Sequence, residues 1–193
     1  MLLENKIAAV TGGSAGIGRG IAEAYLREGA KVAILARNAE KAERMIQELN
    51  AGDRIVFVQG DATIQESVEG FLDETISTFG TIDILVNNAG GAGGDLQPTV
   101  SLTDEEFDFC IKINLYATFW GIRHALKTML PKQSGRIINI SSVEGKHGKP
   151  VLTPYTAAKH AINGMTKSVA REVGTEGITV NSICPGLILT DIV

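Results

Sequence analysis

The sequence predicts an α/β protein with one doubly wound parallel sheet, strand order 3-2-1-4-5-6 and helices on both faces, and three observations support this fold class. Short runs rich in Ile and Val alternate with amphipathic segments along all 193 residues. These runs barely alternate between apolar and polar residues, which is typical of strands buried on both faces. No repeat or linker divides the chain, so we expect a single domain over residues 1–193. The predicted strands are Ile7–Val10, Val32–Leu35, Ile55–Val58, Ile82–Val86, Ile137–Ile140 and Ile178–Ile183.

Helices are predicted between these strands. The segment Ile17–Glu28 gathers apolar residues on one face and stops before Gly29, a residue type that commonly ends helices. Two further helices should begin at capping boxes, in which Thr63 is followed by Glu66 and Thr103 by Glu106. The second of these should run over residues 103–130, before a proline, and the last helix is expected over residues 154–172.

Composition excludes several classes of function. The net charge is −4 with no long run of either sign, which argues against a nucleic-acid or anionic-membrane partner. The two cysteines, Cys110 and Cys184, form no CxxC motif and no histidine has ligand spacing, so we expect neither a metal site nor a disulfide framework. No signal peptide is recognisable, and no apolar run approaches the ~18 residues of a membrane helix. We therefore expect a soluble, cytoplasmic protein.

A glycine-rich turn connects the first predicted strand to the first helix. It reads TGGSAGIG over residues 11–18, with glycines at 12, 16 and 18 in a GxxxGxG spacing. Such a turn lets backbone N–H groups approach a pyrophosphate, and the helix N-terminus favours its negative charge. Glycines also occur in turns for geometric reasons alone, so this motif by itself favours nucleotide binding without proving it. No Walker A lysine is present, so ATP is not favoured.

The end of the second predicted strand bears on which dinucleotide binds. An acidic side chain here would bind the ribose 2′-hydroxyl, whereas an arginine accommodates a 2′-phosphate. The chain has Ala36 followed by Arg37 and Asn38, with no acid before Glu40. We infer that NADP(H) is preferred and that NAD(H) is possible. The alternative is that Arg37 is an ordinary surface arginine.

The pair Tyr155 and Lys159 is the strongest chemical signal. Positions i and i+4 share one face of a helix, and Ser142 ends the fifth strand upstream. A tyrosine needs its pKa lowered by ~3 units, roughly 4 kcal/mol, to act as a base near neutrality. One cation at about 4 Å in an effective dielectric of ~20 supplies about that much. Alone, the tyrosine–lysine pair would be a chance surface pair; together with the serine and the glycine-rich turn it indicates a catalytic site.

These motifs, taken in order, resemble those of the short-chain dehydrogenases/reductases. The matching segments are TGGSAGIG (11–18), NNAG (87–90), Ser142, YTAAK (155–159) and PGLILT (185–190), so the resemblance covers essentially the whole chain. It implies an oxidoreductase that interconverts a carbonyl and a secondary alcohol by hydride transfer with NAD(P)(H). The segment 181–186 resembles 3-oxoacyl-carrier-protein reductases and hydroxybutyrate dehydrogenases, but also sugar and steroid dehydrogenases, so the substrate is left open.

The resemblance also implies roles for individual residues. Tyr155 would be the general acid in reduction and the base in the reverse direction. Lys159 would lower the pKa of Tyr155 and bind the nicotinamide ribose, and Ser142 would polarise the substrate oxygen. Asn114 would hold a water in a proton relay. The substrate would contact Ser142, Glu144, Tyr155 and Leu187, and the cofactor would contact Gly12, Ser14, Gly16, Ile17, Gly18, Arg37, Asn38, Asp61, Ala62, Asn88, Ala89, Gly90, Tyr155, Lys159, Pro185, Gly186, Ile188 and Thr190.

The chain departs from the family pattern in two respects. Many NADP-preferring members place a basic residue where this chain has Ala15, so the NADP(H) preference depends on Arg37, with Ser14 and Asn38 as helpers. Members also usually continue through a substrate lid and a seventh strand, which are absent from these 193 residues. By analogy with other members of the family, we expect a homotetramer or homodimer.

Two rival functions remain open from the sequence. One is a dinucleotide-binding sensor or scaffold without turnover. The other is a related enzyme that uses the same fold for epimerisation or dehydration.

Overall fold

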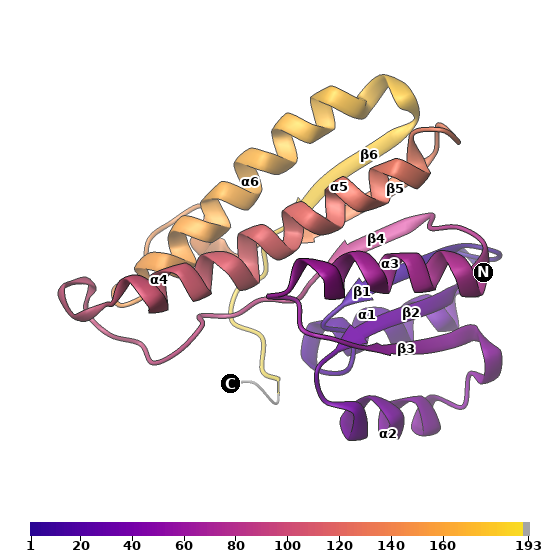
Figure 1. Ribbon diagram of the computed structural model, residues 1–193, viewed down its shortest axis with the longest axis horizontal. Helices are drawn as coiled ribbons and strands as arrows, with labels where there is room; N and C mark the ends of the chain where they lie inside the picture. Colours follow the sequence, from indigo (N-terminus) through magenta and orange to yellow (C-terminus); the bar gives the residue numbers. More distant parts are fainter. Residues whose placement is uncertain (191–193) are drawn as a thin grey trace.

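The computed structural model describes residues 1–190 and consists of a six-stranded parallel sheet with helices on both faces (Figure 1). The strand order is β3-β2-β1-β4-β5-β6, which confirms the predicted fold class. Every pair of neighbouring strands is parallel, as crossover helices require. The strands are β1 (Ile7–Thr11), β2 (Lys31–Ala36), β3 (Ile55–Gln59), β4 (Ile84–Asn87), β5 (Gly135–Ile140) and β6 (Ile178–Ile183).

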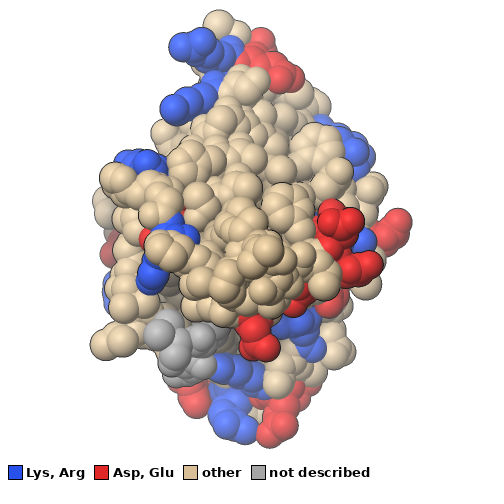
Figure 2. Space-filling model, turned by 90° about the vertical axis from the view of Figure 1, so that its left-hand side faces the viewer, with Lys and Arg blue, Asp and Glu red and all other residues tan. Residues whose placement is uncertain are grey.

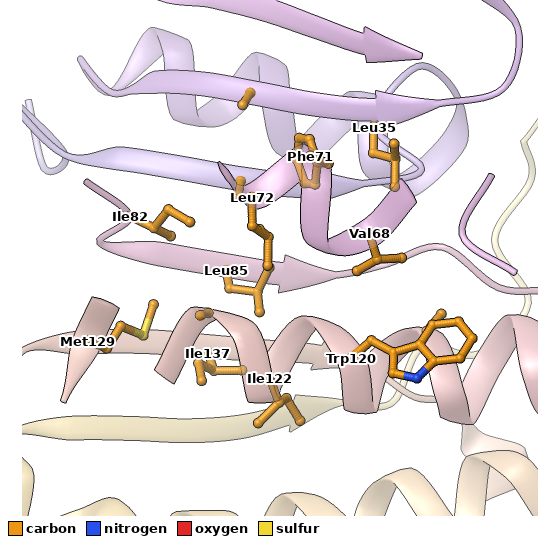
Figure 3. Close-up of a cluster of buried hydrophobic side chains, with 14 of the residues drawn as sticks. Leu35, Val68, Phe71, Leu72, Ile82, Leu85, Trp120, Ile122, Met129 and Ile137 are labelled. Carbon is orange, nitrogen blue, oxygen red and sulfur yellow. The ribbon is translucent and has the colours of Figure 1, made fainter. Parts of the chain in front are cut away.

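The helices divide between the two faces of the sheet, and each group encloses its own apolar core. On one face, α1 (Gly16–Arg27) and α2 (Ala39–Leu49) pack against Val10 and Ile34. On the other, α3 (Gln65–Phe79), α5 (Ala117–Met129) and α6 (Thr153–Val173) pack against Leu85 and Ile137. Figure 3 shows this second core, where side chains of α3 and α5 meet those of the central strands.

The expectation that all strands are buried on both faces is wrong for the two edge strands: in β3 only Ile55 is buried, and β6 alternates. Ile178 and Val180 are buried against α6, but the alternate residues Thr179 and Asn181 are exposed. The reason is that the apolar cluster around α1 and α2 extends to β4 and β5 but includes no residue of β6. In β1, by contrast, all five residues are buried.

The two predicted capping boxes have different outcomes. Thr103 caps α4 (Asp104–Ile111), and its side chain and that of Glu106 each bind the other residue's backbone N–H, as predicted. The box at Thr63 is wrong, because α3 starts after Ile64 and has no side-chain cap. The Thr63 hydroxyl instead donates to the carboxylate of Asp61 at 2.8 Å, before the helix begins.

The long helix predicted over residues 103–130 contains an irregularity that the sequence did not indicate. Between α4 and α5, residues Lys112–Tyr116 form a π-helical segment without interrupting the helix. Asn114, at its centre, is completely buried. Within residues 1–190, no helix has both the length and the apolar character needed to cross a membrane.

Candidate active site

The main cleft lies at the carboxyl ends of the strands, the edge at which open α/β sheets bind their ligands. Its volume is about 490 Å³. One end is formed by the turn after β1 and the segments after β2 and β3. The other end is formed by Ser142, after β5, together with α6 and the residues that follow β6.

The glycine-rich turn has a backbone conformation that favours glycine at two positions. Gly12 and Gly16 have φ angles of +65° and +51°, in the left-handed region. A Cβ on Gly18 would collide with the carbonyl of Gly12, so the absence of a side chain at Gly18 lets α1 start close against the turn. No side chain caps α1 and no acid lies in its first turn. Its N-terminal N–H groups therefore suit an anion.

The segment NNAG after β4 holds this turn in place. The side-chain amide of Asn88 donates to the carbonyls of Thr11 and Gly12 at 2.9 and 3.2 Å. In return, the hydroxyl of Thr11 accepts from the backbone N–H groups of Asn88 and Ala89, both at 3.0 Å. The loops after β1 and β4 are thus joined by four hydrogen bonds.

The segment after β2 forms the far end of the main cleft. Ala36, Arg37 and Asn38 line it as predicted, and Arg37 is exposed. The Asn38 side chain caps α2 by accepting from the backbone N–H of Lys41 at 2.8 Å. Lys41 also lines the cleft, a residue that sequence reasoning missed. Its position three residues after an Asn N-cap was the available signal, because the first turn of α2 then lies beside Arg37.

Ser142, Tyr155 and Lys159 come together at the opposite end. β5 delivers Ser142, and the first two turns of α6 deliver the other two residues. The Ser142 hydroxyl accepts from the backbone N–H of Glu144 at 3.1 Å, and it is within hydrogen-bonding reach of Tyr155. Lys159 is only 4% exposed, and its ammonium lies 5.3 Å from the centre of the Tyr155 ring.

The electrostatics of this group differ from the sequence-based expectation. Burial raises the pKa of Tyr155, and hydrogen bonding to Ser142 opposes this while the charges of Cys110 and Glu144 add to it. The expected lowering by Lys159 is therefore not found in this structure. The ammonium donates at 2.8 Å to the carbonyl of Ile140, and burial lowers the pKa of Lys159 itself to about 8.

Asn114 lies behind the cleft wall. Its amide NH₂ donates to the carbonyls of Gly91 and Cys110, both at 2.8 Å, and its oxygen accepts from the N–H of Gly91 at 3.2 Å. These contacts fasten the segment after β4 to the π-helical segment. The predicted role of holding a water in a relay stays a prediction, because this side chain is already engaged with backbone groups.

Most of the predicted site residues line the main cleft. The exceptions are Gly16, Gly18, Asn114 and Glu144. Three of these support the cleft without lining it. The two glycines shape the glycine-rich turn, and Asn114 binds the backbone of Gly91, which lines the cleft. One Glu144 carboxylate oxygen is buried without a hydrogen-bond partner in the described structure. Among residues 1–190, no three His, Cys, Asp or Glu side chains are grouped to hold a metal ion.

Fold and site together define a class of protein: a Rossmann-type dinucleotide-binding domain with a Ser–Tyr–Lys group at one end of its cleft. A family model described as short chain dehydrogenase matches residues 6–193. The chain belongs to this family of oxidoreductases, as its motifs indicated.

Named relatives cover nearly the whole chain. Zerumbone synthase from Zingiber zerumbet is 39% identical over 191 residues, which are 96% of this chain and 69% of the relative. The 3-oxoacyl-(acyl-carrier-protein) reductase FabG of Staphylococcus aureus is 42% identical over 188 residues, which are 96% and 76% of the two chains. Among solved structures, a substituted actinorhodin polyketide ketoreductase with NADPH superposes with a TM-score of 0.92 at 36% identity, covering 97% of this chain and 72% of that one.

Proposed function

We propose that the protein is an NADP(H)-dependent oxidoreductase that interconverts a carbonyl and a secondary alcohol, with Tyr155 as general acid and base. One observation carries the proposal: Ser142, Tyr155 and Lys159 meet at one end of a cleft whose other end is a glycine-rich turn beside Arg37. The reductase names of the relatives and the NADPH of the ketoreductase structure support the same assignment.

The residues of the main cleft fit a dinucleotide. The uncapped start of α1 suits the pyrophosphate, and Asp61 and Ala62 stand where an adenine would lie. Arg37 and Lys41 bring two cationic side chains to the end expected for a 2′-phosphate. Pro185 and Thr190 line the nicotinamide end. When bound, the cofactor supplies or accepts the hydride.

The chain's own residues then handle the substrate oxygen. With one Ser142 lone pair accepting from Glu144, the Ser142 O–H is available to donate to the carbonyl oxygen of the substrate. This donation withdraws electron density from the carbonyl carbon as negative charge develops on the oxygen. Tyr155 delivers its proton to the same oxygen in reduction, and its raised pKa keeps that proton available at neutral pH.

Lys159 stabilises the tyrosinate left by this transfer. Its ammonium lies over the Tyr155 ring in a buried setting, where a positive charge acts more strongly than in water. In the direction of alcohol oxidation, the hydrogen bond with Ser142 is the contribution that lowers the pKa of Tyr155 and favours loss of its proton. Asn114 is a positioning residue in this scheme, because it holds the Gly91 segment that forms the cleft wall.

Exposed aromatic residues on α4, the π-helical segment and α5 support the further proposal that the protein self-associates. Phe107, Phe109 and Phe119 are each more than a third exposed, and Tyr116 is half exposed. A second copy packed on this surface would remove them from water.

The test is NADPH oxidation against a panel of ketones, oxoacyl thioesters and quinones, with Tyr155→Phe measured beside the wild type. We expect turnover to fall by about 10²-fold or more, the usual size of a lost general acid, with the Kd for NADPH nearly unchanged. Turnover retained in the variant would overturn the mechanism. Tight NADPH binding without turnover on any carbonyl would instead favour a dinucleotide sensor.

A further inference from the structure

Asn163 continues a polar stripe on α6 that begins with Tyr155 and Lys159. The three residues are spaced four apart, and residues at positions i and i+4 of an α-helix lie on the same face. Tyr155 and Lys159 line the main cleft, whereas Asn163 does not and is half-buried one turn further along the helix. Asn163 therefore lies beside the Ser–Tyr–Lys group without being part of the cleft wall.

The Asn163 side chain joins two segments that leave the sheet. Its amide NH₂ donates to the carbonyl of Gly145 after β5 at 2.9 Å, and its oxygen accepts from the thiol of Cys184 after β6 at 3.8 Å. The backbone N–H of Val143 also donates to the carbonyl of Pro185 at 2.9 Å, which joins the same two segments a second time. Because α6 runs along β6 (Figure 1), one side chain of this helix reaches both segments.

The segment after β5 packs directly on α6. Residues Val143–Gly145 form a single turn of 3₁₀ helix, a structure with few hydrogen bonds of its own. A Cβ on Gly145 would lie 2.6 Å from the amide nitrogen of Asn163 and 2.8 Å from the carbonyl oxygen of Lys159. The absence of a side chain at Gly145 thus permits the close approach, and the Asn163 amide binds the carbonyl at the end of the turn.

The same turn determines where the Ser142 hydroxyl lies. The backbone N–H of Glu144 donates to the Ser142 hydroxyl at 3.1 Å, and the N–H of Gly145 donates to the Ser142 carbonyl at 2.9 Å. A serine side chain has three staggered χ1 positions, and the bond from Glu144 favours the one observed. A displacement of the turn would therefore move the Ser142 hydroxyl relative to Tyr155.

We propose that Asn163 is a positioning residue, which holds the turn Val143–Gly145 against α6 and thereby keeps the Ser142 hydroxyl in hydrogen-bonding position beside Tyr155. Its contribution is to the orientation of the group that polarises the substrate oxygen, and it touches neither substrate nor cofactor. This inference rests on the proposed carbonyl–alcohol function, and it adds a residue to the site that performs it.

The first test follows the ionisation of Tyr155 and needs no substrate. Hydrogen bonding to Ser142 lowers the pKa of Tyr155, and this contribution is larger than that of the Glu144 charge, which would move with the same turn. In Asn163→Leu, which keeps a similar volume without a donor, we expect the pKa of Tyr155 to rise. The tyrosinate absorbance of the full chain is titrated, and the difference from the same protein carrying Tyr155→Phe isolates this residue from the other two tyrosines.

The replacement at position 163 is uncharged for an electrostatic reason. Figure 2 shows the end of the molecule at which α6 begins, and the middle of this face is largely free of charged side chains. A carboxylate introduced by Asn163→Asp would act on Lys159 and Tyr155 through its charge as well as through the lost donor. Asn163→Leu removes the donor alone.

The second test separates kcat from binding, with a carbonyl compound that the wild type reduces. Asn163→Leu should lower kcat about tenfold or more, because small displacements of a catalytic group are costly. The KM for the carbonyl and the Kd for NADPH should change by less than about threefold, since the groups that bind them are intact. In a Ser142→Ala background, the same substitution should lower kcat by less than about twofold and leave the pKa of Tyr155 unchanged, because no hydroxyl is left to position.

Thr166→Val is the matched control on the same helix. The Thr166 hydroxyl accepts from the side-chain amide of Asn139 at 2.9 Å and makes no bond to the turn after β5. Its removal leaves a buried amide without that acceptor, so the Tm should fall. The kcat and the pKa of Tyr155 should stay as in the wild type, which distinguishes a structural role from a positioning one.

Asn163→Ala, which adds no bulk, answers the same questions if Asn163→Leu does not fold. An unchanged pKa of Tyr155 in the folded variant would overturn the proposal, and so would an equal loss of kcat with and without the Ser142 hydroxyl. The proposed function fails separately, if no carbonyl in the panel is reduced in a manner that depends on Tyr155. The tyrosinate titration then still decides whether Asn163 positions Ser142.

Discussion

Lys159 donates a hydrogen bond of 2.8 Å to the carbonyl of Ile140, at the end of the strand that also delivers Ser142. This bond anchors the start of α6 to the carboxyl end of β5. It also explains how a lysine that is 4% exposed is tolerated, since the ammonium has a backbone acceptor. The bond compensates only in part for the loss of solvent, and the pKa of Lys159 falls to about 8.

This shift predicts a pH-dependent contribution of Lys159 to stability. The folded protein releases the Lys159 proton near pH 8 and the unfolded chain near 10.5, so the unfolded state binds more protons between these values. The free energy of unfolding of the wild type should therefore rise over this interval relative to Lys159→Met, by on the order of 3 kcal/mol in total. Urea unfolding at pH 7.5 and 10 measures it. The control is Lys167→Met, at an exposed lysine of the same helix, whose free energy of unfolding should change with pH as in the wild type. If the free energy of unfolding changes equally with pH in the wild type and in Lys159→Met, the prediction is contradicted.

Gly18 and Gly20 provide a matched pair on α1. A Cβ at Gly18 would collide with the Gly12 carbonyl, whereas a Cβ at Gly20 meets nothing within 4 Å. Gly18→Ala should therefore displace the turn and weaken NADPH binding at least tenfold, a loss of about 1.4 kcal/mol. Gly20→Ala should raise the free energy of unfolding by about 0.5–1 kcal/mol with unchanged affinity. Fluorescence titration and urea unfolding test both, and equal affinities for the two variants would refute the assignment.

The residues after β2 should govern the choice of cofactor. In Ala36→Asp with Arg37→Ile, a carboxylate replaces the cation at the end of the main cleft. The ratio of kcat/KM for NADPH to that for NADH should fall about tenfold or more, the value of one charged hydrogen bond. The control Arg27→Ile removes an exposed arginine at the end of α1, outside the cleft, and should leave the ratio of the two kcat/KM values unchanged. If the ratio does not move in the double variant, Arg37 does not bind a 2′-phosphate.

Thr63 and Thr103 share the capping-box pattern, but replacing each by alanine should have a different effect on stability and NADPH affinity. Thr103→Ala removes the cap of α4 and should lower the free energy of unfolding by about 1 kcal/mol without changing NADPH affinity. Thr63→Ala removes a hydrogen bond that orients the Asp61 carboxylate in the cleft. We expect it to weaken NADPH binding several-fold. The two affinities are compared by titration, and the reverse pattern would mean that Asp61 makes no cofactor contact.

The fold was predictable because its signals are local and repeated. Each buried strand is a short apolar run, and six such runs alternating with helices indicate a doubly wound sheet, whose order the structure confirms. The exposure of Thr179 and Asn181 was not predictable in the same way, because it depends on which part of the sheet the helices cover. Burial of a strand face is a property of its neighbours as much as of its own residues.

The site was predictable as a set of residues but less so in its energetics. Spacing alone places Tyr155 and Lys159 on one helix face, and the structure brings Ser142 to them. The sequence could not indicate that Lys159 binds the Ile140 carbonyl, since that acceptor is a backbone group with no sequence signature. Nor could it indicate that burial would dominate the pKa of Tyr155, because desolvation depends on the whole packed surroundings.

Because of the π-helical segment Lys112–Tyr116, evolution should preserve the number of residues between α4 and α5. Removing one residue would close this wide turn into ordinary α-helix and remove the local bulge that carries Asn114. Asn114 could then no longer reach both Gly91 and Cys110. Descendants of this sequence should therefore tolerate point substitutions between α4 and α5 more readily than a single-codon deletion, whereas the exposed stretch 94–96 should accept changes in length.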